Sequence, residues 1–270
     1  MPILTPSGRG MGHLDGPFEL PSTKRLFGAR RGLGALMGNV DLRPFVDQIR
    51  NQGKTSRCVG AAASRILHIA AQRQRGGPDF TVPYPSERGQ YSLAREEACV
   101  TGDEPLVDEG SYPGMLAQAV TRDVGIVLER DFPEDDDRIN ERVPAEVLAK
   151  SLSLKVQAAH AIDSDGTMRV DDAVQTLLDG FGFICGIPVG DQYENCDSET
   201  PVGPAQGTIY GRHCIAIVGV KTVAGRRLFL NAGSWGTDFG FGGFVWLDES
   251  VILDPRASDF TVFTVVPDFK

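Results

Sequence analysis

The sequence lacks any hydrophobic run long enough to cross a membrane. A membrane-spanning helix needs roughly 18 to 20 consecutive apolar residues, and no stretch of the 270 residues approaches that length. The first residues, MPILTPSGRGMGHLDG, also lack the basic stretch followed by an apolar stretch that marks a secretory signal peptide. We therefore expect no membrane association, and a location in the cytoplasm or another reducing compartment, free or within a larger particle.

Cysteine is scarce, with five residues among 270, and the number is odd. A small secreted domain held together by disulfides would have more cysteines and an even number of them. No two of the cysteines show the C-x-x-C spacing that is typical of structural zinc sites. The sequence thus predicts reduced thiols, of which at least one is available for chemistry, and it predicts neither a metal nor a cofactor.

Positive charge is in deficit, because 27 Lys and Arg residues face 36 Asp and Glu residues, giving a formal net charge of −9. Proteins that bind nucleic acid through its phosphates need a net or clustered positive surface. We therefore expect no nucleic-acid partner. The composition, 41% hydrophobic and 23% charged, is that of an ordinary globular protein, and a chain of this length can bury a sizeable core without covalent cross-links.

The chain divides into an N-terminal arm and a folded domain that begins at residue 39. Residues 1–38 are rich in glycine and have no long periodic apolar pattern, which indicates a flexible or surface-wrapping arm, able to dock on a protein partner or to act as a short inhibitory leader. Helices followed by strands predict an α+β fold, with a helical lobe over about 40–140 and a β-barrel-like lobe over about 141–270. The patterns predict helices at 58–73, 91–99, 114–124 and 144–151, and strands at 183–189, 214–220, 227–231 and 243–247.

Cys58 is the cysteine best placed to act as a nucleophile. It stands at the beginning of the predicted helix 58–73, where free backbone N–H groups and the positive end of the helix dipole favour a thiolate. Arg57 adds positive charge beside it. Gln52 lies six residues upstream on a Gln-Gly turn, so its side-chain amide can return beside Cys58. That amide and the backbone N–H of Cys58 would form a two-donor oxyanion hole.

His213 is the best-placed general base among the four histidines. It begins an apolar strand directly after a glycine-containing loop, so the sheet holds its backbone while its ring can reach a cleft. The other three have no neighbouring motif, because His13 lies in the arm, His68 within a predicted helix and His160 in an alanine-rich stretch. Cys58 and His213 together therefore predict a thiol nucleophile with an imidazole base.

Four segments of the chain resemble, in order, the motifs of the papain-like cysteine peptidases. QGKTSRCV at 52–59 is similar to that family's Q-G-x-C-G-S-C-W, and GSYP at 110–113 is similar to its G-G-Y-P. GRHC at 211–214 resembles G-x-H-A, and SWGTDFGFGGF at 234–244 resembles N-S-W-G-T-x-W-G-x-x-G-Y without its leading asparagine. The resemblance covers about residues 40–270 and implies a papain-like fold of two lobes with the active site between them.

The resemblance implies a role for each matched residue in the hydrolysis of a peptide or protein substrate. Cys58 would attack the scissile carbonyl. His213 would hold the thiolate as an ion pair and then protonate the leaving amine, while Gln52 would donate a hydrogen bond to the oxyanion. The residues implied to line the cleft are Gly110 and Ser111, through backbone hydrogen bonds, Tyr112, and Trp235, which would shield the histidine from water.

The third catalytic position departs from the family pattern. Alignment on Trp235 places Gly233 where the family has the asparagine that orients the histidine. Asn231 lies two residues upstream, so on a strand its side chain would face the same side about 7 Å further along. We expect Asn231 to orient His213 if a bulge closes that gap. Ser234, a backbone carbonyl or a water molecule is the alternative.

Other departures leave further alternatives open. Thr55 stands where the family has a disulfide-bonded cysteine, which agrees with a reducing compartment, and the arm is too short to be the family's usual inhibitory pro-segment. One alternative to a peptidase is an inactive papain-like fold that binds or assembles other proteins. Another is a cysteine transferase or cell-wall amidase. For a peptidase, Tyr112 and Pro113 favour an apolar substrate side chain next to the cleavage position.

Overall fold

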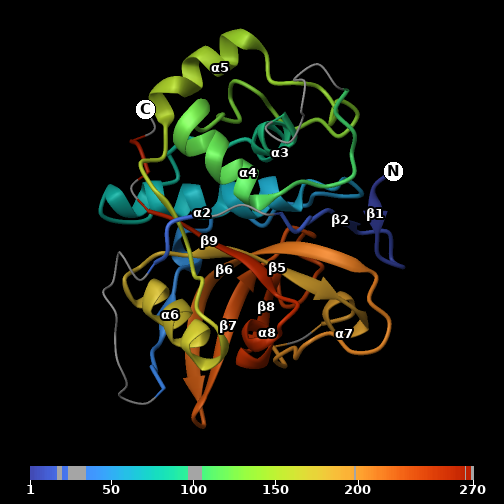
Figure 1. Cartoon of the computed structure of the whole chain (residues 1–270), viewed down its shortest axis with the longest axis vertical. Helices are drawn as coiled ribbons and strands as arrows, with labels where there is room; N and C mark the ends of the chain where they lie inside the picture. Colours follow the sequence, from blue (N-terminus) through green and yellow to red (C-terminus); the bar gives the residue numbers. More distant parts are fainter. Residues whose placement is uncertain (17–19, 24–34, 97–104, 198, 265, 269–270) are drawn as a thin grey trace.

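The computed structural model shows a helical layer above an antiparallel sheet, with α2 (Cys58–Gln74) between the two (Figure 1). The α+β class predicted from the sequence is confirmed. Because α2 contacts both layers, nearly all of its residues are buried, and its alanines and Gly60 permit this close packing. A Cβ at Gly60 would lie 2.3 Å from the carbonyl oxygen of Glu87 in the next helix. The structure describes residues 1–16, 20–23, 35–96, 105–197, 199–264 and 266–268.

The helical layer follows the predicted pattern with shifted boundaries. The predicted helix 58–73 is α2, and the predicted helix 91–99 begins earlier, as α3 (Glu87–Glu96), while residues 97–99 lie outside the described part of the chain. The other helical segments of this layer are α4 (Pro113–Gln118), η2 (Ala119–Asp123), α5 (Ala145–Ser151) and η3 (Leu152–Leu154), and η1 (Arg43–Phe45) precedes α2.

The sheet runs in the order β4-β9-β5-β6-β7-β8, with β3 also paired to β6, and all of its pairs are antiparallel. The predicted strand 183–189 is β5 (Phe183–Val189), which is buried along its whole length, as expected for a continuous apolar run. The remaining strands are β3 (Val40–Asp41), β4 (Ala159–Ala161), β6 (Gly211–Val223), β7 (Arg226–Ala232), β8 (Phe244–Asp248) and β9 (Ser258–Phe263).

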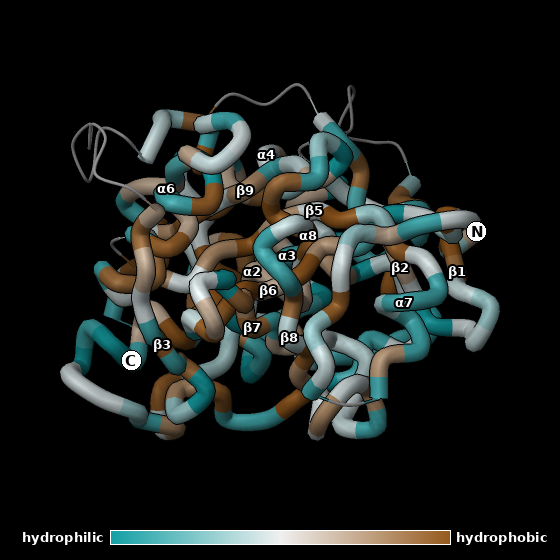
Figure 2. The backbone as a smooth tube through the Cα atoms, turned by 90° about the horizontal axis from the view of Figure 1, so that it is seen from below, coloured by the Kyte–Doolittle hydropathy of each residue, from teal (hydrophilic) through white to brown (hydrophobic). Residues whose placement is uncertain are grey.

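The prediction of a barrel-like lobe is wrong in one respect, because the sheet does not close. Its end strands β4 and β8 do not pair with each other among the described residues. Instead α6 (Gly166–Leu178) and α8 (Glu249–Leu253) contact the sheet and each other, so helices rather than strand closure bury its apolar side chains. Figure 2 shows hydrophobic segments concentrated along the central elements and hydrophilic segments in the peripheral loops.

The first part of the arm lies against the folded domain. β1 (Ile3–Leu4) and β2 (Gly10–Met11) form a small hairpin, and β2 contacts β6. Figure 1 shows this hairpin beside the junction of the helical layer and the sheet. Residues 17–19 and 24–34 of the predicted arm lie outside the described residues. Among the described residues, no helix combines the length and the apolarity needed to cross a bilayer.

Candidate active site

Cys58 and the backbone next to His213 meet between α2 and β6. Cys58 is the first residue of α2, and its Sγ accepts a hydrogen bond from the backbone N–H of Cys214 at 3.3 Å. His213 precedes Cys214 on β6 and is paired with Ile187 of β5. One helix and one strand thus bring the Cys58 thiol beside the backbone next to His213, 155 positions further along the sequence. No hydrogen bond between the thiol and the His213 ring is present among the described residues, and His213 Nδ1 has no partner there.

An aromatic cluster encloses the imidazole of His213. The indole of Trp235 lies 4.5 Å from it between ring centroids, and the phenol of Tyr193 lies 6.1 Å from it. Tyr193 in turn packs 5.4 Å from Trp235 and 5.2 Å from Phe239. His213 is only 1% exposed, so water is excluded from the ring on this side. Tyr193, from the short helix α7 (Asp191–Glu194), carried no sequence motif that pointed to the site.

Asn231 is buried in the same region but pairs with Tyr193 instead of His213. Its Nδ2 donates to the Tyr193 hydroxyl at 2.9 Å. A register shift between β6 and β7 lies at positions 217–219, opposite Asn231, yet neither Asn231 Oδ1 nor His213 Nδ1 has a hydrogen-bond partner among the residues that the structure describes. The expected contact is therefore not made, and the role of Asn231 in orienting His213 stays a prediction.

Replacing Tyr193 by phenylalanine is expected to lower the free energy of unfolding by about 1–3 kcal/mol, because it leaves the buried Asn231 amide without an acceptor. The measurement is urea denaturation followed by circular dichroism. The matched control is Tyr210→Phe, since the Tyr210 hydroxyl bonds to Asp191 at the surface. We expect the control to change stability by less than about 0.5 kcal/mol, and equal losses in the two variants would contradict the importance of the Asn231 contact.

The side chain of Gln52 donates a hydrogen bond to a peptide carbonyl of the arm. The second donor to that oxygen is Trp235, whereas the sequence predicted the backbone N–H of Cys58. Gln52 Nε2 donates to the carbonyl oxygen of Gly10 at 3.1 Å, and Trp235 Nε1 donates to the same oxygen at 3.0 Å. Gln52 Nε2 also donates to Thr55 O at 2.8 Å, and its Oε1 accepts from Ser234 Oγ at 2.6 Å. These bonds fix the orientation of the amide group, and its Nε2 donates to two carbonyl oxygens, of which one belongs to the arm.

The arm passes through the cleft in backbone contact with Ser111. The Ser111 N–H donates to Gly12 O at 2.8 Å, and the Leu14 N–H donates to Ser111 O at 3.0 Å. The N–H of His13 donates to Arg212 O at 3.3 Å on the other side of the cleft. The backbone of Ser111 thus binds the chain's own arm, and its predicted role in binding a substrate stays a prediction.

Glycines permit this close approach. A Cβ at Gly10 would lie 2.0 Å from the carbonyl oxygen of Thr55, and a Cβ at Gly12 would lie 2.2 Å from that of Ser56. On the facing wall, Gly110 has φ +105°, a conformation that favours glycine, and a Cβ there would lie 2.4 Å from Gly12 O. The glycine content, which predicted a flexible or surface-wrapping arm, serves tight packing here.

No protein-family model matches the sequence, and no curated protein matches it. Solved structures do match. Xylellain, a cysteine protease from Xylella fastidiosa, is 18% identical with a TM-score of 0.75, and the match covers 96% of this chain and 97% of xylellain. Procathepsin B S9 from Trypanosoma congolense is 14% identical with a TM-score of 0.67, covering 96% and 87% of the two chains. This chain has the papain-like fold. Bromelain from Ananas comosus, solved with the E64 inhibitor, also matches, at 13% identity and a TM-score of 0.64, covering 86% and 100%.

In this papain-like fold the arm lies over Cys58 and His213, an arrangement that we call the covered state. Both side chains are uncharged in it. Cys58 is 0% exposed, and burial raises its pKa to about 12, although N–H groups of Cys214, Gly12 and the first turn of α2 oppose the shift. Burial lowers the pKa of His213 to about 3, and the nearby His13 lowers it further. The thiolate expected from the helix dipole is therefore absent in the covered state, because desolvation outweighs the dipole.

Arg57 does not supply the positive field that the sequence indicated. Its guanidinium is buried, with Nε 3.6 Å from Glu87 Oε2 and 3.5 Å from Glu134 Oε2, and it also pairs with Asp136. Three carboxylates thus surround one cation. Burial and the neighbouring Glu87 raise the pKa of Glu134. Arg57 therefore ties the loop before α2 to the helical layer instead of polarising Cys58.

The described cysteines Cys58, Cys185, Cys196 and Cys214 are all free thiols, while Cys99 lies outside the described residues. In the part of the chain that the structure describes, one group of side chains has the spacing of metal ligands, His13, Asp15 and Asp259, and it contains no cysteine.

Tyr112, predicted to line the cleft, faces the arm, because a Cβ at Gly16 would lie 2.8 Å from its ring.

Proposed function

We propose that the protein is a cysteine peptidase, with Cys58 as nucleophile, His213 as base and acid, and Gln52 as oxyanion donor, held in a latent state by its arm. The observation that carries this proposal is the path of the arm. An extended peptide lies across Cys58, bound through backbone hydrogen bonds to Ser111 and through the side-chain donors of Gln52 and Trp235. A site that binds one peptide in this way is built to bind others.

The reaction begins when the arm leaves and water reaches the site. His213 then takes the proton of the Cys58 thiol, and the thiolate attacks the carbonyl carbon of the scissile peptide bond. The developing oxyanion accepts hydrogen bonds from Gln52 Nε2 and from the N–H groups beside Cys58. His213 gives its proton to the leaving amine, which leaves a thioester on Cys58. Water activated by His213 hydrolyses the thioester and regenerates the thiol.

One observation favours the alternative of a non-catalytic binding or assembly protein. Within the described part of the chain, His213 Nδ1 and Asn231 Oδ1 are both buried without partners, so none of these residues orients the imidazole through Nδ1 in the covered state. In that alternative the arm would be a permanent part of the fold. The third possibility, a transferase or amidase, uses the same Cys58 chemistry on another amide.

Incubation with denatured casein and a peptide library under reducing conditions tests the proposal. We expect peptide products that disappear after alkylation of Cys58 with iodoacetamide. A Gly12→Val variant serves as the open form, because a Cβ at this position would clash with Ser56. If that variant is fully alkylated at Cys58 yet cleaves no peptide, the peptidase proposal fails. Cleavage of cell-wall fragments instead of peptides would favour the amidase.

A further inference from the structure

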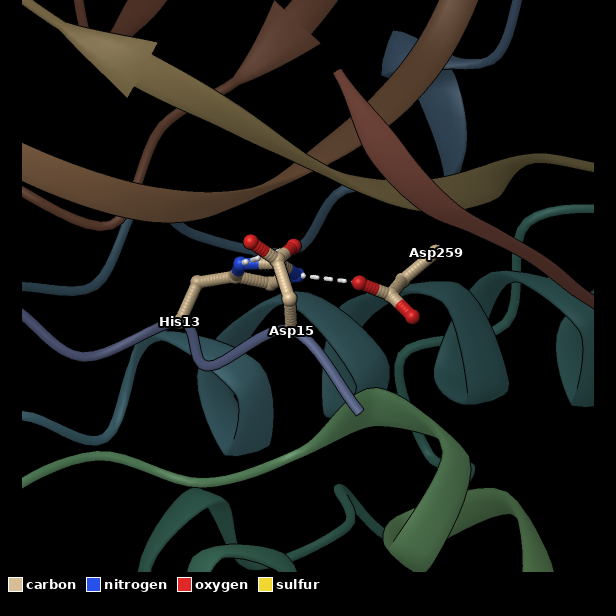
Figure 3. Close-up of side chains that lie close together, drawn as sticks. All are labelled: His13, Asp15 and Asp259. Carbon is tan, nitrogen blue, oxygen red and sulfur yellow. Dashed lines mark ion pairs between the residues drawn. The ribbon is translucent and has the colours of Figure 1, made fainter. Parts of the chain in front are cut away.

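The imidazole of His13 lies in a closed pocket beside the cleft. Its side chain is 0% exposed, and the ring covers Gly186 of β5, where a Cβ would come within 2.2 Å of the ring atoms. Figure 3 shows the ring facing the carboxylate of Asp259, with Asp15 beside it. The missing side chain at position 186 therefore makes room for a flat group that enters from the cleft.

Two residues of the domain face the two ring nitrogens. Arg212 Nε donates to His13 Nδ1 at 3.3 Å, and His13 Nε2 lies 3.0 Å from Asp259 Oδ2. The carboxylate of Asp259 lies beside Nε2, but no hydrogen bond of good geometry joins the two. The pocket thus offers one hydrogen-bond donor and one acceptor to the group inside it.

Arg212 and Asp259 are held in place by the domain itself. Arg212 donates to the carbonyl oxygen of Arg256 and to Ser258 Oγ, both at 2.7 Å. Ser258 Oγ also donates to Asp259 Oδ2 at 2.7 Å. Asp15 of the arm also contacts this cluster, 2.9 Å from Arg212 Nη2 and 2.5 Å from Ser258 Oγ, but the other contacts named here are made within the domain. When the arm leaves, the pocket therefore keeps its donor and its acceptor.

The same cluster is not well suited to a metal ion. His13, Asp15 and Asp259 offer ligand atoms within 4.8 Å of one another. The guanidinium of Arg212, however, already donates to His13 and pairs with Asp15, so a positive charge lies against two of the three side chains that would bind a metal. Repulsion between the two cations disfavours metal binding.

We propose that this pocket binds a substrate side chain that offers one hydrogen-bond donor and one acceptor, namely histidine or the amide of glutamine or asparagine. The proposal rests on the peptidase function, with His13 in the position of the substrate side chain beside Ser111. Lysine or arginine would bring a second cation to Arg212. Leucine would leave Asp259 and Arg212 unpaired, and a site built for hydrogen bonds strongly rejects a group that makes none.

This selectivity differs from the apolar preference that Tyr112 and Pro113 favour in the sequence. The test uses synthetic peptides with the sequence of residues 8–16, GRGMGHLDG, in which the residue equivalent to His13 is histidine, glutamine, leucine or lysine. Each is added to the full-length Gly12→Val variant, and protection of Cys58 from iodoacetamide is measured near neutral pH. We expect the histidine and glutamine peptides to protect at concentrations on the order of a hundredfold lower than the leucine and lysine peptides.

Equal protection by all four peptides, or a preference for leucine or lysine, would overturn the proposal. An Arg212→Met substitution in the same variant removes the donor and leaves Asp259 unopposed, so we expect lysine to become the best protecting residue. The matched control is Arg226→Met, whose side chain is 66% exposed on β7, and it should keep the histidine and glutamine preference. An unchanged preference in Arg212→Met would also contradict the proposal.

Two features keep this test independent of folding and of turnover. If Arg212→Met does not fold, alkylation of Cys58 is compared between two full-length variants, His13→Gln and His13→Leu. Only the leucine variant is expected to expose Cys58 to alkylation. Since protection is measured by alkylation of Cys58, it tests the side-chain preference of the pocket even when no peptide is cleaved. Absence of cleavage in every variant would instead contradict the proposed function.

Discussion

Replacing Gly12 by valine is expected to raise the rate at which iodoacetamide alkylates Cys58 by about a hundredfold or more near neutral pH. A Cβ at this position would lie 2.2 Å from Ser56 O and 2.6 Å from Ser56 Cβ. Neither atom can move without displacing the loop that carries Cys58, so the arm must leave instead. Water then reaches the thiol and removes the desolvation that raises its pKa.

The pH dependence of arm release follows from the two shifted groups. The pKa of Cys58 is raised to about 12 in the covered state, so the covered state loses stability as pH rises above the ordinary thiol value of about 8.5. The pKa of His213 is lowered to about 3, so the covered state also loses stability as pH falls below about 6.5, the ordinary histidine value. The arm should therefore hold most firmly between these two values.

Two measurements check this prediction. Alkylation of the wild type should rise with pH well into the alkaline range, whereas that of Gly12→Val should level off at lower pH. Fluorescence of Trp235, whose indole N–H bonds to Gly10 O, should reach that of the Gly12→Val variant as the wild type is acidified below about pH 6.5. Gly203→Val is the control, because a Cβ at Gly203 meets no atom within 4 Å. Equal alkylation of wild type and Gly12→Val would refute the interpretation that the arm protects Cys58.

The sequence was sufficient to place Cys58, His213 and Gln52 in one region, because each stands in a motif whose local structure is determined by a few neighbours. Cys58 begins a helix and His213 lies on a buried strand, as predicted. The hydrogen-bond partner of the Asn231 side chain could not be predicted from neighbouring residues in the sequence. It depends on Tyr193, which reaches the site only through the packing of α7 against the sheet.

The sequence left open whether the arm is flexible or wraps the surface, and it did not predict α6, for different reasons. Gly10 and Gly12 indicated flexibility, since composition alone does not distinguish a mobile glycine from one that allows two backbones to touch. For α6 a local signal existed, because Val170, Ala173, Val174 and Leu177 follow helical spacing and are all buried. The open sheet follows from the packing of α6 and α8, a long-range contact that strand patterns do not encode.

In the open Gly12→Val background, Cys58→Ala and His213→Ala are each expected to reduce peptide cleavage by about 10⁴- to 10⁶-fold. The reason is that a nucleophile and its base act as a unit, so that loss of either removes the covalent route. The measurement is turnover of the best peptide from the library. The matched controls are Cys196→Ala and His160→Ala, a half-buried thiol and a buried histidine on β4, and both should retain activity.

Alkylation of Cys58 distinguishes the two losses. In His213→Ala the thiol remains, but no imidazolium stabilises its thiolate, so its alkylation near neutral pH should fall about tenfold or more relative to the open parent and recover only at alkaline pH. His160→Ala should leave the alkylation profile unchanged. If His213→Ala alkylates with the same pH profile as the parent, His213 is not the partner of Cys58, because a base that shares a proton with a thiol must alter the titration of that thiol.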